Sequence, residues 1–145
     1  MAGLFFLDLE VQIFTQAINA LLADGASLVL TLPWSTDLLP RFYQGVNQGL
    51  AYSTWLYFYG KMAKAISKKR YGGLYFYVSD FFETVFFNFT EYGFLYNYPG
   101  WDNNPNLSAN EYVFWDDAHP SGSTHQLIAG DFIQFLIQAG LLSKQ

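Results

Sequence analysis

The chain has 145 residues, the size of one domain, and 52% of them are hydrophobic, which is enough to build a core. Only 13% of the residues are charged and the net charge is −5, which argues against a nucleic-acid partner because phosphate binding needs a basic surface. The chain has no cysteine, so disulfide frameworks and cysteine-based metal sites are excluded.

The first half of the chain predicts a helix, a strand and a second helix. Apolar residues recur at helical spacing between about residues 8 and 24, and Gly25 stands where a left-handed helix cap is expected. The apolar run from Ala26 to Leu32 ends at Pro33 and predicts a strand that is covered on both faces. Apolar residues repeat at helical spacing again from Tyr52 to Ile66 and predict the second helix. A basic cluster closes that helix, where cations favour the negative end of the dipole: Lys61, Lys64, Lys68, Lys69 and Arg70.

The middle of the chain predicts a second strand and a third helix. The glycine pair 72–73 ends the preceding helix, Leu74 to Val78 predicts a strand, and Asp80 with Glu83 resembles a helix-capping pair. Residues 96–110 are rich in Asn, Pro, Gly and Asp, and this composition predicts a long surface loop of the functional kind.

The end of the chain predicts a last helix that begins at Pro120. Its buried stripe is expected to consist of Leu127, Ile128, Phe132, Phe135, Leu136 and Ala139. The order helix, strand, helix, strand, helix is typical of the right-handed βαβ unit of an open α/β sheet. Because two strands cannot form a doubly wound domain, we expect residues 1–145 to be one domain that is part of a larger fold.

Targeting features are few. The first ten residues lack a basic region and contain acids from Asp8 onward, so no signal peptide is predicted. The longest uncharged stretch, residues 42–60, is interrupted by polar residues and glycines, so no membrane span is predicted. Asn88 and Asn106 begin two glycosylation sequons, which would suit a secreted protein.

Asp116 and His119 are the candidate catalytic residues. At a spacing of three, a carboxylate can bond one nitrogen of the imidazole and leave the other nitrogen free to act as a base. The same two residue types beside a helix start are also common as a cap and a surface residue. The longer string from Phe114 to Ala129, which reads FWDDAHPSGSTHQLIA, favours the catalytic interpretation.

This string resembles the last conserved block of the GDSL or SGNH ester hydrolases, and most closely their secreted fungal carbohydrate-esterase branch. The strand that closes on Pro33, Asn47, the Val78-Ser79-Asp80 strand end and the turn 91–94 are similar to the second half of that family, in its order. The resemblance implies a partial flavodoxin-like fold, a three-layer α/β/α domain with parallel strands that lacks its N-terminal strands.

The resemblance also implies the chemistry of the site. Asp116 would orient the imidazole, His119 would be the general base of serine acyl transfer, and Asp117 would occupy a variable position. His125 also matches a common family residue, but its place on the last helix favours a structural role. The implied substrate is a small-molecule or polysaccharide acyl ester, no cofactor or metal is implied, and the complete family member would be extracellular.

The blocks that carry the rest of this chemistry are missing from the sequence. None of the nine serines stands in Gly-Asp-Ser or Gly-x-Ser-x-Gly, and we expect the oxyanion blocks that follow the nucleophile in that family to be missing as well. Ser35, after the first strand, could be proposed as a substitute nucleophile, but no supporting block accompanies it. We therefore expect the chain alone to be inactive, whether it is a truncated gene model, a fragment or a degenerate copy.

Two other functions compete with the hydrolase interpretation. A metal site could use Asp116, Asp117, His119 and His125, but their spacing matches no metal motif that we recognise. A carbohydrate-binding module without catalysis could use Trp34, Trp55, Trp101 or Trp115 as flat faces for sugar rings, although most such aromatics fill cores. Trp101, in the polar loop, is the expected exposed candidate.

Overall fold

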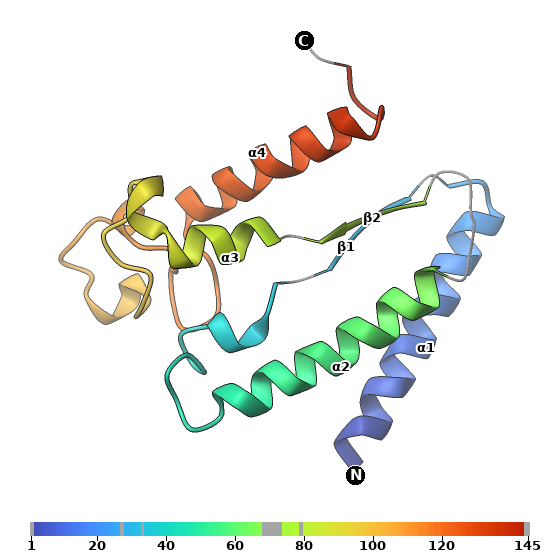
Figure 1. The fold of residues 1–145 in the computed structure, drawn as a ribbon, viewed down its shortest axis with the longest axis horizontal. Coiled ribbons are helices and arrows are strands. Elements are labelled where there is room, and N and C mark those ends of the chain that lie inside the picture. Colours follow the sequence, from blue (N-terminus) through green and yellow to red (C-terminus); the bar gives the residue numbers. More distant parts are fainter. Residues whose placement is uncertain (1, 27, 33, 68–73, 79, 144–145) are drawn as a thin grey trace.

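The computed structural model describes residues 2–26, 28–32, 34–67, 74–78 and 80–143 (Figure 1). The elements follow in the order α1 (Ala2–Ala23), β1 (Leu28–Leu32), α2 (Gln48–Ser67), β2 (Leu74–Val78), α3 (Asp80–Phe87) and α4 (Gly122–Gln138). Short 3₁₀ turns lie between them, at Thr36–Leu38, Phe89–Tyr92, Trp101–Asn103 and Ala109–Glu111. Several sequence predictions fall outside the described residues: Pro33, Lys68, Lys69, Arg70, the glycines 72–73 and Ser79.

Helix α1 begins earlier than predicted but ends as predicted. Gly25 has a φ of 81°, and the Ala26 N–H donates to the Leu21 carbonyl over 3.0 Å, which closes the helix with a left-handed cap. The predicted start near residue 8 is wrong because Asp8 does not interrupt the helix. Its carboxylate is exposed and reaches α2 instead.

Helices α1 and α2 pack against each other. The Tyr57 hydroxyl donates to the Asp8 carboxylate over 3.1 Å, and the Lys61 ammonium lies 3.2 Å from the same carboxylate. Lys61, a member of the basic cluster predicted to close this helix, therefore pairs with the neighbouring helix α1. Among the described helices, none combines the length and apolar character needed to cross a lipid bilayer.

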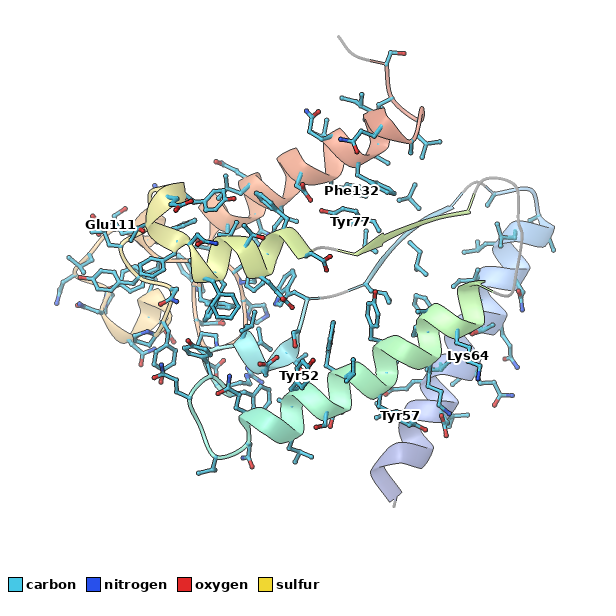
Figure 2. The ribbon with its side chains drawn as sticks, viewed as in Figure 1. Tyr52, Tyr57, Lys64, Tyr77, Glu111 and Phe132 are labelled. Carbon is cyan, nitrogen blue, oxygen red and sulfur yellow. The ribbon has the colours of Figure 1, made fainter. Side chains whose placement is uncertain are left out.

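Strands β1 and β2 align in parallel, from Leu28 opposite Leu74 to Leu32 opposite Val78. This narrow pair lies between α4 and the two N-terminal helices in Figure 1, and it is the whole sheet of the described residues. Figure 2 shows Tyr77 of β2 beside Phe132 of α4, with ring centroids 5.1 Å apart.

The predicted fold class, a three-layer flavodoxin-like α/β/α domain, is wrong. The chain is mostly helical, and two strands of five residues offer too little surface for helices to cover on two faces. The largest buried side chains do not lie on the strands. They form a core where α3 meets the first 3₁₀ turn and the segment before α4, and this core consists of Leu38, Phe82, Val85, Phe86, Phe94, Val113 and Phe114.

Helix α4 presents the predicted stripe toward the protein. Leu127, Ile128, Phe132, Phe135 and Leu136 are all half-buried, whereas Gly130, Ile133 and Gln134 on the same helix are exposed. The predicted first residue, Pro120, is wrong, because α4 begins at Gly122 with Ser121 as its N-cap.

Candidate functional site

Asp116 and His119 lie in a tight hairpin that precedes α4. Phe114 and Pro120 face each other in an antiparallel bridge at the base of this hairpin. The Trp115 N–H donates to the His119 carbonyl over 2.7 Å and closes the turn. The backbone therefore brings the two candidate residues to the same turn, with Phe114 buried on the core side.

The base of the hairpin is fixed to the first turn of α4. The Ser121 N–H donates to the Val113 carbonyl over 2.8 Å, and the buried Thr124 hydroxyl donates to the same carbonyl over 2.7 Å. The Ser121 hydroxyl accepts the Thr124 N–H as the helix cap. Because all three residues are buried, the site turn is attached to a rigid support.

Asp116 binds His119 through both its side chain and its backbone. The Oδ2 atom of Asp116 lies 2.8 Å from Nδ1 of His119, and Oδ1 lies 3.0 Å from the same nitrogen. Oδ1 also accepts the backbone N–H groups of Ala118 and His119, each over 2.7 Å. This arrangement holds the imidazole in one orientation, as the spacing of three predicted.

The pKa of Asp116 is lowered from its usual 3.8 to about 2. Partial burial by itself would raise this pKa, but hydrogen bonds from the Ala118 N–H and from the His119 side chain and N–H outweigh it. The carboxylate therefore stays ionised at every pH above this range and remains an acceptor for the imidazole.

This shift predicts how stability depends on pH. Because the pKa of Asp116 is lower in the folded chain, its contribution to stability is present above about pH 4 and is lost as the pH falls through about 2. A carbon-13 NMR titration should show no step for the Asp116 carboxyl near 3.8. His119→Ala should raise the pKa toward its usual value without restoring it fully, because the backbone donors remain. A midpoint near 4 in the unmodified chain would contradict the described geometry.

The second ring nitrogen of His119 is available for chemistry. The His119 side chain is 75% exposed, compared with 30% for Asp116. Among the described residues, none forms a hydrogen bond with Nε2 of His119. The imidazole therefore has one nitrogen held by a carboxylate and one that faces solvent.

Gly100 supports the site turn from the neighbouring loop. A β-carbon at this position would lie 2.3 Å from the carbonyl oxygen of Asp116 and 2.8 Å from its α-carbon. On either side of this contact, the Trp101 N–H donates to the Phe114 carbonyl and the Asp102 N–H donates to the Trp115 carbonyl, both over 3.0 Å. The predicted functional loop thus contributes close backbone packing behind Asp116, which the sequence analysis missed.

Trp101 and Trp115 pack beside this contact in a tilted arrangement, with ring centroids 4.3 Å apart and planes inclined by 37°. Trp101 is half-buried, and its indole N–H donates to the Leu107 carbonyl over 2.7 Å. Trp115 is 46% exposed. The prediction that Trp101 is the exposed aromatic of this region is therefore wrong, because its indole is used within the loop and Trp115 presents the larger surface.

Asp117 ties the site turn to the segment after β1. Arg41 Nη2 lies 2.7 Å from Asp117 Oδ1, and the Arg41 N–H donates to the Asp117 carbonyl over 3.0 Å. Sequence reasoning gave Asp117 only a variable position in the motif and a place in a possible metal site, and its partner Arg41 stands 76 positions earlier in the chain. No local pattern could have revealed this contact.

Ser35 does not join the site turn by any hydrogen bond among the described residues. It is buried, and its hydroxyl donates to the carboxylate of Asp37. A hydroxyl that is enclosed and already bonded to a carboxylate is a poor candidate nucleophile.

His125 lies on α4 and forms no hydrogen bond with Asp116 or His119 among the described residues. Within the same part of the chain, no group of three or more His, Asp and Glu side chains is placed to hold a metal ion. The arrangement that can carry chemistry is thus the Asp116–His119 pair. Comparison with protein-family models and with curated proteins gives no match to this chain.

Proposed function

We propose that Asp116 and His119 are the Asp-His half of a serine ester hydrolase active site. The observation that carries the proposal is the 2.8 Å contact between Nδ1 of His119 and Oδ2 of Asp116. A carboxylate in this position keeps the proton on Nδ1 and leaves the lone pair on Nε2, the nitrogen that accepts a proton from a hydroxyl.

The chemistry requires a hydroxyl that comes from outside the described site. As that hydroxyl attacks the carbonyl carbon of an ester, Nε2 of His119 takes its proton, and Asp116 stabilises the imidazolium that forms. His119 then gives the proton to the leaving alkoxide, so that an acyl-enzyme remains. A water molecule releases the acid in the same way, with His119 again acting as the base.

The substrate class and the location follow from the resemblance of the motif. We propose an acyl ester of a small molecule or a polysaccharide as the substrate, and an extracellular setting for the complete enzyme. The reaction uses no cofactor.

The chain by itself should not hydrolyse esters at a measurable rate. Loss of a triad nucleophile costs a factor of about a million in turnover, and loss of an oxyanion donor costs about another hundred- to thousand-fold. Purified chain and His119→Ala should therefore give the same slow background with an activated acetyl ester. A fluorophosphonate probe should label neither protein. Rapid turnover that His119→Ala abolishes would show that a nucleophile is present in this chain.

A carbohydrate-binding module without catalysis is the second candidate, and the exposure of Trp115 favours it. Binding of this kind does not need the imidazole. Retention on an insoluble polysaccharide that is lost in Trp115→Ala and kept in His119→Ala would support it over the hydrolase.

A further inference from the structure

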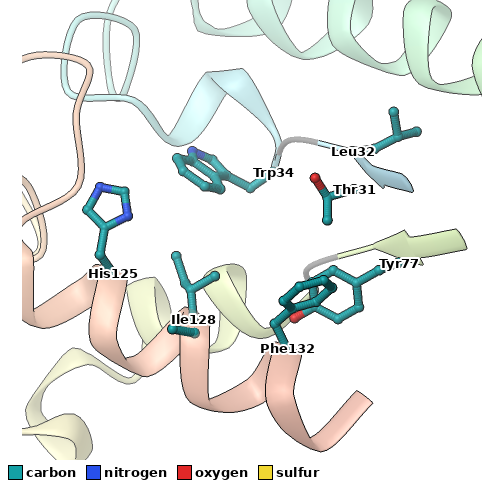
Figure 3. A pocket seen from close by; sticks show the side chains of 8 residues that line it. Thr31, Leu32, Trp34, Tyr77, His125, Ile128 and Phe132 are labelled. Atoms are coloured by element: carbon teal, nitrogen blue, oxygen red, sulfur yellow. The ribbon is translucent and has the colours of Figure 1, made fainter. Parts of the chain in front are cut away.

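A cavity of about 480 Å³ lies between the strand pair and α4. Figure 3 shows His125 at one end of the lining and the rings of Tyr77 and Phe132 at the other, with Trp34 and Ile128 between them. None of the lining residues belongs to the Asp116–His119 pair. The volume is in the range of pockets that bind small molecules.

The walls of the cavity are aromatic rings that neighbouring groups hold in place. Trp34 stacks on Phe82 of α3, with centroids 4.4 Å apart and planes inclined by 23°. Tyr77 packs on Phe132 at an inclination of 54°, and its hydroxyl donates to the carboxylate of Asp131. Because stacked and tilted rings favour further offset or edge contacts, these walls suit a flat aromatic guest.

The end of the cavity at His125 is polar. His125 is exposed, and its ring nitrogens form no hydrogen bond with any described residue. No Asp or Glu side chain lines the cavity, and its other polar side-chain groups are the Thr31 hydroxyl, the Trp34 indole N–H and the Tyr77 hydroxyl, which donates to Asp131. An imidazole that can donate to a carboxylate, with no lining acid to repel it, favours an anionic head group at this end.

We propose that this cavity binds a small aromatic carboxylate, with its ring between Trp34 and Phe132 and its carboxylate at His125. The inference is independent of the proposed hydrolase function, because it needs neither Asp116 nor His119. Its test is a binding measurement, so its failure leaves the hydrolase proposal unaffected.

The first experiment is an NMR titration of the full chain with 3-phenylpropionate. We expect saturable shifts of the Ile128 methyl signals. Ala129→Phe fills the cavity from α4 and should weaken binding at least about tenfold, whereas Gln134→Phe adds the same ring to the exposed face of that helix and should change nothing. Thr31→Leu narrows the cavity from β1 and should also weaken binding. It replaces Ala129→Phe as the test if that variant does not fold. Absence of saturable shifts, or equal losses in Ala129→Phe and Gln134→Phe, would overturn the proposal.

The second experiment tests the head group. His125→Ala should weaken the binding of 3-phenylpropionate by about tenfold, since a charge-assisted hydrogen bond is lost. The same variant should leave the binding of the neutral 3-phenylpropanol unaffected. Equal effects on the acid and the alcohol would show that His125 does not bind the carboxylate, and would overturn that part of the proposal.

Discussion

Gly100→Ala should destabilise the folded chain by about 1–3 kcal/mol, as forced overpacking does in well-packed regions. The added carbon would lie 2.3 Å from the carbonyl oxygen of Asp116, and the opposing atoms are backbone, which cannot rotate away. The backbone of Gly100 has φ −66° and ψ 158°, a conformation that alanine adopts freely, so the steric contact alone is responsible. Thermal unfolding followed by circular dichroism measures the loss.

The matched control is Gly130→Ala in α4. A β-carbon there meets no atom within 4 Å, and alanine stabilises a helix interior by up to about 1 kcal/mol relative to glycine. Gly100→Ala should also move the backbone of Asp116 and return its pKa from about 2 toward 3.8, which Gly130→Ala should not do. Equal stability of the two variants would mean that the loop does not press on the site turn.

The local elements of the fold were predictable because their causes lie within a few residues of one another. Strand β2 has the predicted bounds, Leu74–Val78, since a compact apolar run needs no distant partner to be recognised. The left-handed cap at Gly25 depends on a single residue type. The Asp116–His119 contact spans three positions, so the spacing made the contact possible and the surrounding string singled it out.

The arrangement of these elements was not predictable, because it depends on which apolar faces meet. The pattern of the strands suggested a sheet covered on both faces, yet the core formed by Phe82, Phe86 and Phe114 lies beside the sheet instead of on it. The sequence analysis predicted core residues from the periodicity of apolar positions. Phe114 lies in a segment without such periodicity, so this method could not identify it as a core residue. An apolar run shows that a segment is buried without showing what buries it.

Two contacts at the site show the same limit. Arg41 binds Asp117, which lies 76 positions later in the chain. Gly100 packs closely against the backbone of Asp116 because glycine has no side chain at that point. Neither contact leaves a spacing or a motif in the sequence. The contact between Asp116 and His119 was therefore readable from the sequence, while the groups that hold the site turn in place were not.

Asp116→Asn should reverse the protonation of the imidazole without disturbing the turn. The Asn Oδ1 can still accept the N–H groups of Ala118 and His119, which now bond to Oδ1 over 2.7 Å. The amide nitrogen would take the place of Oδ2, 2.8 Å from Nδ1 of His119. Because an amide N–H₂ can only donate, the shorter of the two contacts favours Nδ1 as the acceptor, and we expect the proton of neutral His119 to move to Nε2 although Oδ1 lies 3.0 Å from Nδ1.

Nitrogen-15 NMR of the His119 ring measures this change directly. In the unmodified chain at a pH where the ring is neutral, the proton should lie on Nδ1, and in Asp116→Asn it should lie on Nε2. Asp117→Asn is the matched control, since that carboxylate bonds to Arg41 and should leave the ring unchanged. Unaltered amide signals of Ala118 would confirm that the turn is intact, and a ring that keeps its Nδ1 proton in Asp116→Asn would contradict the orienting role.

The reversal matters because it separates geometry from chemistry. With the proton on Nε2, the nitrogen that faces solvent can no longer accept one, although the ring stays in the same place. In serine proteases the equivalent change lowers turnover by about ten-thousand-fold. If Asp116 were only a cap for the hairpin, Asn would replace it fully, because the cap uses Oδ1 and the shorter contact with Nδ1 uses Oδ2. The protonation of the ring therefore distinguishes a carboxylate that orients the imidazole from one that only caps the turn, in a chain that we expect to show no measurable turnover.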